Sequence, residues 1–260
     1  MLNIKELKKL AVKEGIPLAI VEKDLALSVA LKAIAQQALA KHVVFKGGTA
    51  IKKVYFKEAR FSEDIDFTVL DIDKQSCLAM LCYALEGISF EGIKFEKIEE
   101  ERTPEGLKVA IKFVGPLVQP QRIRFDFNFR KNLVEKPLTH ELIDSYGIGR
   151  VGLLTLSLEE LLAEKLHALI SRSSPRDLYD IWFLFGKNVI LNAKIVKMKF
   201  AYYDEKVDLA KLESKISEYG KDWQRDLRHL IGKVPEFKVL ANEVISELKK
   251  RVSDDLVSQV

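Results

Sequence analysis

Hydrophobic and polar residues alternate without a break from Ile123 to Arg130, where each odd position is apolar and each even position is polar. A period of two is typical of a β-strand that buries one face. The stretch from Leu107 to Val114 also alternates, and residues 89–96 are expected to be extended as well. These stretches predict a sheet in the middle of the chain.

Apolar residues spaced three or four positions apart predict helices on both sides of this sheet. Before and within the sheet, the expected helices are residues 4–14, 18–39 and 74–85. Ser157 is a suitable N-cap for the first helix after it, and the part that follows is expected to be mainly helical.

The segment 131–157 is rich in proline and glycine, so we place a boundary there. The predicted fold class is α/β (α+β), a mixed sheet core with flanking helices and a helical C-terminal region. We expect N-terminal helices packed on the core at residues 1–40, the core at residues 41–155 and the helical region at residues 156–260.

Composition narrows the class of protein only slightly. With 260 residues, 48% of them hydrophobic, the chain can bury a full core. Its net charge of +4 permits a nucleic-acid partner without arguing for one. Cys77 and Cys82 have the spacing of neither a zinc site nor a redox motif, so we expect reduced thiols and a cytoplasmic protein. No apolar run is long enough to cross a membrane.

Two carboxylates lie two residues apart in a stretch of strand character. Asp64 and Asp66 should therefore share one face, while Ile65 and Phe67 point to the other. Like charges repel each other in a dry site, and a cation between them removes that cost. Mg²⁺, or Mn²⁺ in its place, is the expected ion because it takes oxygen ligands and substrate phosphates.

A glycine pair upstream offers the complement to this metal site. Gly47 and Gly48 follow a short apolar run and Lys46, and they open a helical segment. Backbone N–H groups at such a turn approach a phosphate closely, with the Thr49 hydroxyl as a further donor and Ser62 as another candidate. The two halves together indicate phosphoryl or nucleotidyl transfer. The alternative is an ordinary glycine turn followed by a strand whose aspartates are solvated.

The order Gly47-Gly48-Thr49, helix and Asp64-x-Asp66 resembles the signature of the nucleotidyltransferase superfamily. The surrounding residues 45–50 and 60–67 are closer still to the AbiEii/AbiGii family, which includes the MenT toxins and forms the toxin half of type IV toxin–antitoxin pairs. The resemblance implies a nucleotidyltransferase-like fold and an NTP substrate. It also implies an RNA acceptor, such as a tRNA 3′ end, and a cognate antitoxin.

The resemblance implies a third carboxylate on a neighbouring strand, and Asp126 stands in the polar face of the strand at 123–130. It would serve as a metal ligand or as the general base for the attacking hydroxyl. The alternative is a surface aspartate paired with Arg124 or Arg130.

A second cluster of AbiEii-like residues follows residue 157. Lys165 lies in an EKL-x-AL helix, and Arg176, Asp177 and Asp180 begin the next one. The cations would neutralise an NTP triphosphate, and the aspartates would orient them or a hydroxyl. Taken alone, the lysine is more typical of a solvated helix face and the aspartates of helix N-terminal acids.

Two other stretches receive no site role. Residues 22–24, Glu-Lys-Asp, also resemble the family, but they fit a solvated first helical turn equally well. The basic and aromatic residues at 194–203 would suit RNA contact but are more typical of a solvated edge. Three alternatives to an RNA-modifying toxin stay open: a nucleotidyltransferase acting on a small molecule such as an antibiotic, a non-catalytic nucleotide-binding module, and a stand-alone interaction protein, which would need no such pair of aspartates.

Overall fold

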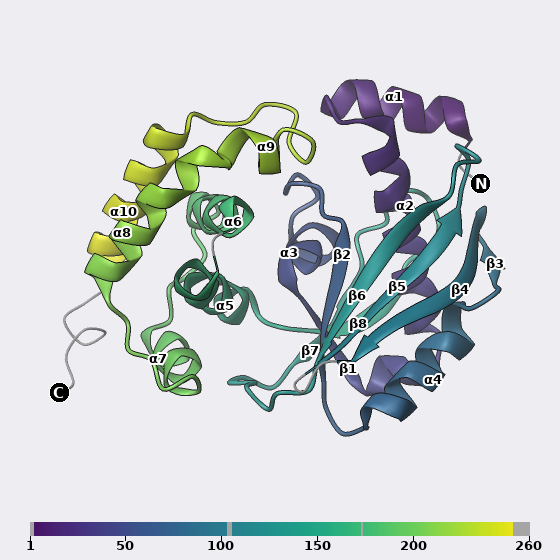
Figure 1. Ribbon diagram of the computed structural model, residues 1–260, viewed down its shortest axis with the longest axis horizontal. Helices are drawn as coiled ribbons and strands as arrows, with labels where there is room; N and C mark the ends of the chain where they lie inside the picture. The colour runs from purple at the N-terminus through teal and green to yellow at the C-terminus, as the bar shows by residue number, and fades with distance from the viewer. Residues whose placement is uncertain (1–2, 103–105, 173, 252–260) are drawn as a thin grey trace. The chain divides into compact units, whose positions relative to one another are not determined.

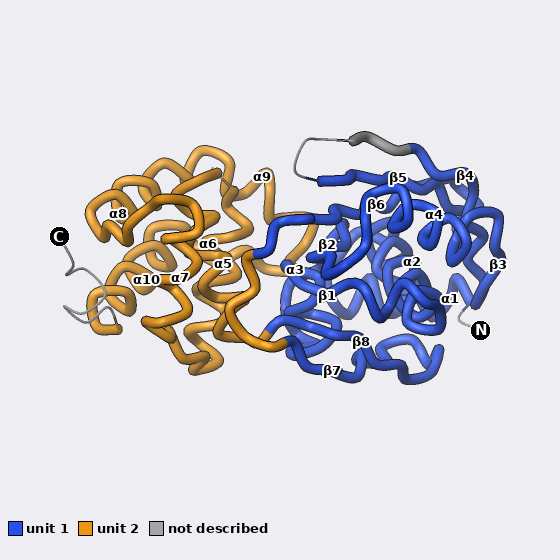
Figure 2. Tube along the Cα trace, turned by 90° about the horizontal axis from the view of Figure 1, so that it is seen from below, with its two compact units in different colours: residues 1–131, 137–156 blue, residues 132–136, 157–260 orange. Residues whose placement is uncertain are grey.

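A computed structural model describes residues 3–102, 106–172 and 174–251 (Figure 1). The chain divides into two compact units (Figure 2). Unit 1 comprises residues 1–131 and 137–156, and unit 2 comprises residues 132–136 and 157–260. The chain thus enters unit 2 briefly, returns to unit 1, and then completes unit 2.

Unit 1 is built on an eight-stranded mixed sheet in the order β3-β4-β5-β6-β2-β1-β8-β7. Strands β2 and β6 are parallel, as are β1 and β8, and the other neighbours are antiparallel. The mixed α/β fold predicted from the sequence is therefore confirmed. The strands are β1 (Val43–Lys46), β2 (Asp64–Val69), β3 (Ser89–Phe90), β4 (Ile93–Arg102), β5 (Gly106–Val114), β6 (Gln121–Asn128), β7 (Leu138–Glu141) and β8 (Gly152–Thr155).

The central strands bury a row of aromatic residues on one face. Phe45 pairs with Phe67, and Phe67 pairs with Phe127, whose ring stacks on it at a centroid distance of 5.5 Å. All three are fully buried. Because side chains alternate along a strand, the residues between them project from the opposite face.

The helices of unit 1 fit the apolar periods of the sequence. Helix α2 is buried along most of its length and packs against β6 and α4, and α4 packs against β4. The helical segments are α1 (Ile4–Glu14), α2 (Leu18–Ala35), the 3-10 turn η1 (Ala38–Lys41), α3 (Gly47–Ala50), the π-helix η2 (Ile51–Tyr55) and α4 (Lys74–Leu85).

Unit 2 consists of helices around its own core. Ser157 caps α5, as predicted, by accepting a hydrogen bond from the Glu160 N–H at 3.2 Å. Trp223 is 1% exposed, and its indole N–H donates to the Pro235 carbonyl at 2.9 Å. The helices are α5 (Leu158–Ser171), α6 (Pro175–Gly186), α7 (Ala193–Ala201), α8 (Leu209–Glu218), η3 (Tyr219–Lys221), α9 (Trp223–Leu227) and α10 (Phe237–Arg251). None of the helices in the described ranges is long and apolar enough to span a membrane.

The structure differs from the sequence-based prediction at several element boundaries. Helix α2 ends at Ala35 instead of residue 39. The stretch at 89–96 is a β3–β4 hairpin, because Glu91 and Gly92 both have positive φ, as a tight hairpin turn requires. The loop-rich segment 131–157 contains β7 and β8, whose four residues each are too few to show a period.

Candidate active site

The glycine turn lies directly against the acidic strand. Gly47 follows β1 with φ +76°, a conformation that residues with a side chain adopt only at a cost. A Cβ atom on Gly47 would overlap the Asp66 carboxylate and lie 2.8 Å from its Cγ. Glycine is therefore required here both for the backbone conformation and for space. The turn and the carboxylate form one compact unit of structure.

Backbone pairing and one side-chain contact fix this arrangement. Lys46 and Asp66 are Cα partners in the antiparallel β1–β2 ladder. The Thr49 hydroxyl, 1% exposed, donates a hydrogen bond to the Asp64 carbonyl oxygen. Thr49 thus ties the first turn after the glycines to the start of β2. The hydroxyl donates to the backbone here, and the role of Thr49 in phosphate binding stays a prediction.

The predicted division of β2 into two faces is present. Ile65 and Phe67 are fully buried, whereas Asp64 and Asp66 are half-buried on the other face. Asp126 joins them, because β6 lies parallel to β2 with Asp66 and Asp126 as direct partners. Neighbouring residues in register share a face. Three carboxylates from two strands therefore lie on one side of the sheet.

Two lysines extend this row across four strands. Lys46 of β1 partners Asp66, and Lys108 of β5 partners Asp126. The order across the sheet is therefore Lys46, Asp66, Asp126, Lys108. Like charges in the centre are flanked by opposite charges at each end, which lowers the repulsion between the two aspartates.

The oxygen ligands present suit a hard divalent ion. In the described ranges no group of three or more His, Cys, Asp or Glu side chains is arranged to hold a metal ion, and the set Asp64, Asp66 and Asp126 stays a prediction. Mg²⁺ needs fewer, since it is commonly held by one or two carboxylates together with substrate phosphates. Asp64 and Asp66, two residues apart on one face, are compatible with that mode.

The other predicted phosphate contacts of unit 1 are Gly48, Ser62 and Lys46. Gly48 is buried in α3, and Ser62 is 7% exposed just before β2. Lys46 is half-buried at the end of β1, immediately before the turn. Of these three, only Lys46 has a direct backbone partner on the acidic strand.

The predicted residues of unit 2 form a buried ion cluster between α5 and α6. The Lys165 Nζ lies 2.8 Å from Asp177 Oδ1 and 2.8 Å from Asp180 Oδ2. All three residues are at most 6% exposed. The solvated helix face expected for Lys165 taken alone is therefore wrong, because the carboxylates that make its burial tolerable come from the next helix.

Arg172 completes this cluster, and no pattern in the sequence distinguishes it as a site residue. Its Nε lies 2.8 Å from Asp177 Oδ2, and a terminal nitrogen lies 3.0 Å from Oδ1. Burial alone would raise the pKa of Asp177, but Lys165 and Arg172 outweigh it and hold the pKa well below its usual value. The predicted Arg176 is half-buried in the first turn of α6 and takes no part in these ion pairs.

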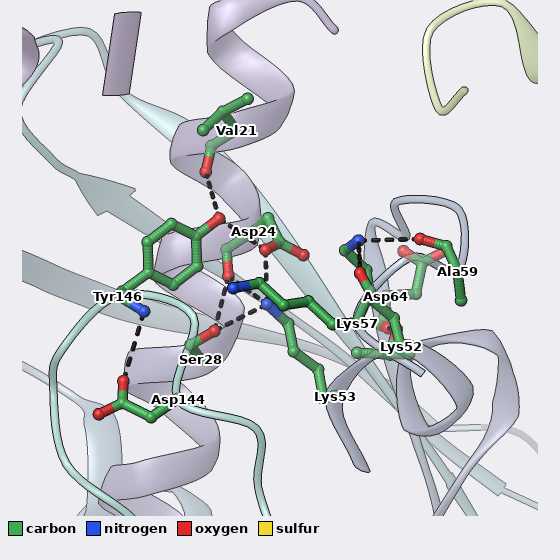
Figure 3. A network of polar contacts seen from close by, with 11 residues as sticks. Val21, Asp24, Ser28, Lys52, Lys53, Lys57, Ala59, Asp64, Asp144 and Tyr146 are labelled. Atoms are coloured by element: carbon green, nitrogen blue, oxygen red, sulfur yellow. Dashed lines mark hydrogen bonds and ion pairs between the residues drawn. The ribbon is translucent and has the colours of Figure 1, made fainter. Parts of the chain in front are cut away.

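Glu22 and Asp24 of the Glu-Lys-Asp segment are buried, which corrects the solvated first turn expected from the sequence. Glu22 is fully buried and accepts hydrogen bonds from the Leu117 N–H and the Gln121 side chain, each at 2.5 Å. Asp24 is 1% exposed and binds Lys53 Nζ at 2.5 Å and the Tyr146 hydroxyl at 2.6 Å (Figure 3). Partners distant in the sequence make this burial possible.

The Asp24 network holds the π-helix that follows the glycine turn. Lys53 of η2 also donates to Ser28 at 2.8 Å, so α2 is linked to η2 by a buried lysine. Burial lowers the pKa of Lys53, and Asp24 opposes that shift. The neighbouring Lys52 donates to the Lys57 and Ala59 carbonyls at 2.9 and 2.8 Å, and burial lowers its pKa to about 8. These contacts order the segment that leads to β2.

In the basic stretch at 194–203, expected to be a solvated edge, Lys199 is the exception. Lys199 is 1% exposed and lies 2.7 Å from Glu160 and 3.0 Å from Glu164. Burial would lower the pKa of Lys199, but the two glutamates outweigh it and raise the pKa. Lys194 and Lys197 are exposed on α7. Only part of the stretch is thus accessible to a partner.

Comparison with known proteins places the chain in a family. Residues 29–247 match the model of the nucleotidyl transferase AbiEii toxin of type IV toxin–antitoxin systems. The structure is similar to that of MenT4, a nucleotidyltransferase toxin from Mycobacterium tuberculosis H37Rv, with a TM-score of 0.71 and 17% identity over 98% of this chain and 92% of that one. No curated protein matches the sequence. The match covers both the carboxylate face and the Lys165 cluster, and the chain belongs to the AbiEii family of nucleotidyltransferase toxins of type IV toxin–antitoxin systems.

Proposed function

We propose that the enzyme transfers a nucleoside monophosphate from an NTP to the hydroxyl of an RNA, such as a tRNA 3′ end. In this reaction the hydroxyl oxygen bonds to the α-phosphorus, the bond to the β-phosphate oxygen breaks, and pyrophosphate leaves. The proton of the hydroxyl passes to a base. Because little covalent chemistry falls to the protein in phosphoryl transfer, its tasks are to position the reactants and stabilise charge.

Each task is assigned to named residues of unit 1. Asp64 and Asp66 hold Mg²⁺ or Mn²⁺, which neutralises charge on the triphosphate when bound. The N–H groups of Gly47 and Gly48 contact phosphate oxygens, with Lys46, Thr49 and Ser62 in support. Asp126 accepts the proton, since it lies on the same face as the metal carboxylates and beside Asp66. It is the base, or a further metal ligand.

Lys165 of unit 2 is proposed as a contact of the triphosphate, with Arg176 as a second cation. Asp177 and Asp180 orient the Lys165 ammonium, and the two 2.8 Å ion pairs support this part of the proposal. A lysine held in one position by two carboxylates loses little conformational freedom on binding a phosphate. A cognate antitoxin is the expected protein partner, because the family is that of type IV toxins.

One observation carries this proposal: there is no space for a side chain between Gly47 and the Asp66 carboxylate. A phosphate bound at the turn would lie beside a metal held on the strand. If the aspartates were merely solvated and the turn were an ordinary one, the close contact between Gly47 and the Asp66 carboxylate would have no purpose. The same geometry also suits an acceptor of low molecular weight, so the acceptor has to be identified by experiment.

The test is label transfer by the purified enzyme. Each of the four α-labelled NTPs is incubated with total tRNA, with Mg²⁺, Mn²⁺ or chelator, and the RNA is separated from free nucleotide. We expect label on RNA with at least one NTP, no label with chelator, and a loss of at least about 10³-fold in Asp64→Ala. Transfer that survives Asp64→Ala contradicts the metal assignment, and label found only on small molecules contradicts the RNA acceptor.

A further inference from the structure

The face of the sheet that carries the three aspartates continues into a band of cations on β5 and β6. Lys108 partners Asp126, and Arg124 partners Asp64. Two residues further from the aspartates, Lys112 and Arg122 are partners of each other. These four residues, Lys108, Lys112, Arg122 and Arg124, share the polar face because they all alternate with the buried residues of their strands. We call them the β5–β6 band.

The band is accessible, and its acidic neighbours lie on β4, where Glu101 is the backbone partner of Lys108. Lys108 and Arg124 are exposed, and neither forms a hydrogen bond or ion pair with a side chain that the structure describes, a set that does not include the side chain of Glu101. Lys112 and Arg122 are 41% and 52% exposed in their side chains. Both lie near one carboxylate, Glu99 of β4, at 3.5 and 3.4 Å. Ion pairs this long and exposed contribute little, so Glu99 only partly offsets the charge.

The shape of the band suits an extended polyanion. From Asp126 to Arg122 the strand advances by four residues, roughly 13 Å at about 3.3 Å per residue. Cations therefore extend along the strands from the side of the aspartates, instead of surrounding them. A free nucleotide would need charge at one point, whereas a nucleic-acid strand presents a phosphate at every step.

We propose that the β5–β6 band binds the phosphates of the RNA acceptor next to its reacting end. This inference rests on the proposed function, because the direction in which the RNA lies along the band is set by the assignment of Asp126 as the base at its reacting end. The terminal hydroxyl lies at Asp126, the phosphates nearest the end contact Arg124 and Lys108, and the following phosphates contact Lys112 and Arg122. The contacts are to the backbone of the RNA, so they position the end without reading its sequence.

The experiment measures RNA binding without the transfer reaction. Fluorescently labelled tRNA is titrated with the full chain at several salt concentrations, and NTP binding is measured separately. The test variant is Lys108→Ala/Arg124→Ala, which removes two exposed cationic side chains of the band. The matched control is Lys194→Ala/Lys197→Ala, which removes two exposed lysines from α7. Circular dichroism and Tm establish that each variant is folded.

We expect the band variant to bind tRNA about tenfold more weakly at moderate salt. Its slope of log affinity against log salt should fall by roughly 1.4, since each lost contact to a single strand removes about 0.7. The control and the NTP affinity should stay unchanged. In addition, Glu99→Gln should tighten tRNA binding about two- to threefold, because it removes a negative charge from the band.

An unchanged salt slope in the band variant would overturn the proposal, as would an equal loss in the α7 control. Weaker NTP binding with normal tRNA binding would assign the band to the nucleotide instead. The experiment separates this proposal from the proposed function. If tRNA binds through the band but no label is transferred, the result supports the band as an RNA-binding surface and contradicts only the proposed reaction.

Discussion

The carboxylate face of unit 1 and the ion cluster of unit 2 use the same residue types in different ways. Lys165, Asp177 and Asp180 are buried, and the Lys165 ammonium of α5 lies 2.8 Å from each of the two carboxylates of α6. Asp64, Asp66 and Asp126 are half-buried on a sheet face, beside a turn with no side chain. The comparison teaches that charge alone does not mark a site, and that its accessibility and its neighbours do.

Asp126→Asn should have the largest effect on activity with little effect on stability, which would separate the carboxylate face from the ion cluster. Loss of a general base typically reduces the rate 10²–10⁴-fold, and we expect transfer to fall by that amount. The unfolding free energy should change by no more than about 0.5 kcal/mol, because the side chain is half-buried at a polar face. Asp71→Asn, an exposed carboxylate after β2, is the control. Label transfer and urea unfolding are the measurements, and unchanged transfer would remove Asp126 from the reaction.

Lys165→Met should lower the free energy of unfolding strongly, whereas Asp126→Asn should hardly change it. Lys165→Met leaves two buried carboxylates with one fewer cation, which typically costs about 3–5 kcal/mol. Arg172→Met is the matched control and should cost about 1 kcal/mol, since the Arg172 side chain is 64% exposed. Urea unfolding followed by circular dichroism measures both. Equal losses would show that the cluster is not held by its buried lysine. Transfer by the folded fraction of Lys165→Met, which we expect to be reduced, tests the triphosphate contact.

Gly47→Ala tests the contact between turn and strand. Both Gly47 and Gly87 have positive φ, at +76° and +71°, so alanine at either should cost roughly 1–2 kcal/mol in backbone strain. Only at Gly47 does the new Cβ meet a carboxylate, whereas nothing lies within 4 Å of it at Gly87. We therefore expect transfer to fall at least about tenfold in Gly47→Ala and to persist in Gly87→Ala. Equal activity of the two variants would contradict a close approach of the turn to Asp66.

The smallest expected effect is a pH dependence of stability from Lys52. Its pKa is about 8 in the folded chain and near 10.5 when unfolded. Between these values the unfolded chain binds the extra proton, so stability rises with pH, by at most about 1.4 kcal/mol per pH unit. The neutral amine can still donate to the Lys57 and Ala59 carbonyls. Urea unfolding of the wild type and Lys52→Met at pH 7.5 and 9.5 should show this rise only in the wild type. A parallel response of both proteins would assign it to other groups.

Local patterns in the sequence were sufficient to predict the central strands of the sheet. The period of two at 123–130 predicted β6, and the spacing of Asp64 and Asp66 predicted two carboxylates on one face of β2. The glycine turn and the acidic strand were expected to form one site, and the β1–β2 pairing brings Gly47 against the Asp66 carboxylate. The fold class and the family are confirmed.

Features that depend on distant partners could not be predicted in the same way. Asp24 is buried because Lys53 and Tyr146 meet it, and no local pattern connects these three residues. Lys199 was similarly misjudged, since its glutamates lie in α5. Arg172 has no feature in the sequence that separates it from Arg176. Charged residues at helix ends therefore need the structure before they can be called solvated.

The most direct test of the nucleotide site is the divalent-ion dependence of NTP binding. Calorimetric titration with each NTP, in Mg²⁺ and in chelator, is compared between the wild type and Asp64→Asn/Asp66→Asn, with Tm as the check of folding. We predict that Mg²⁺ tightens binding of at least one NTP in the wild type and gives no gain in the double variant. An equal gain in the double variant, or none in the wild type, would contradict a metal site on β2.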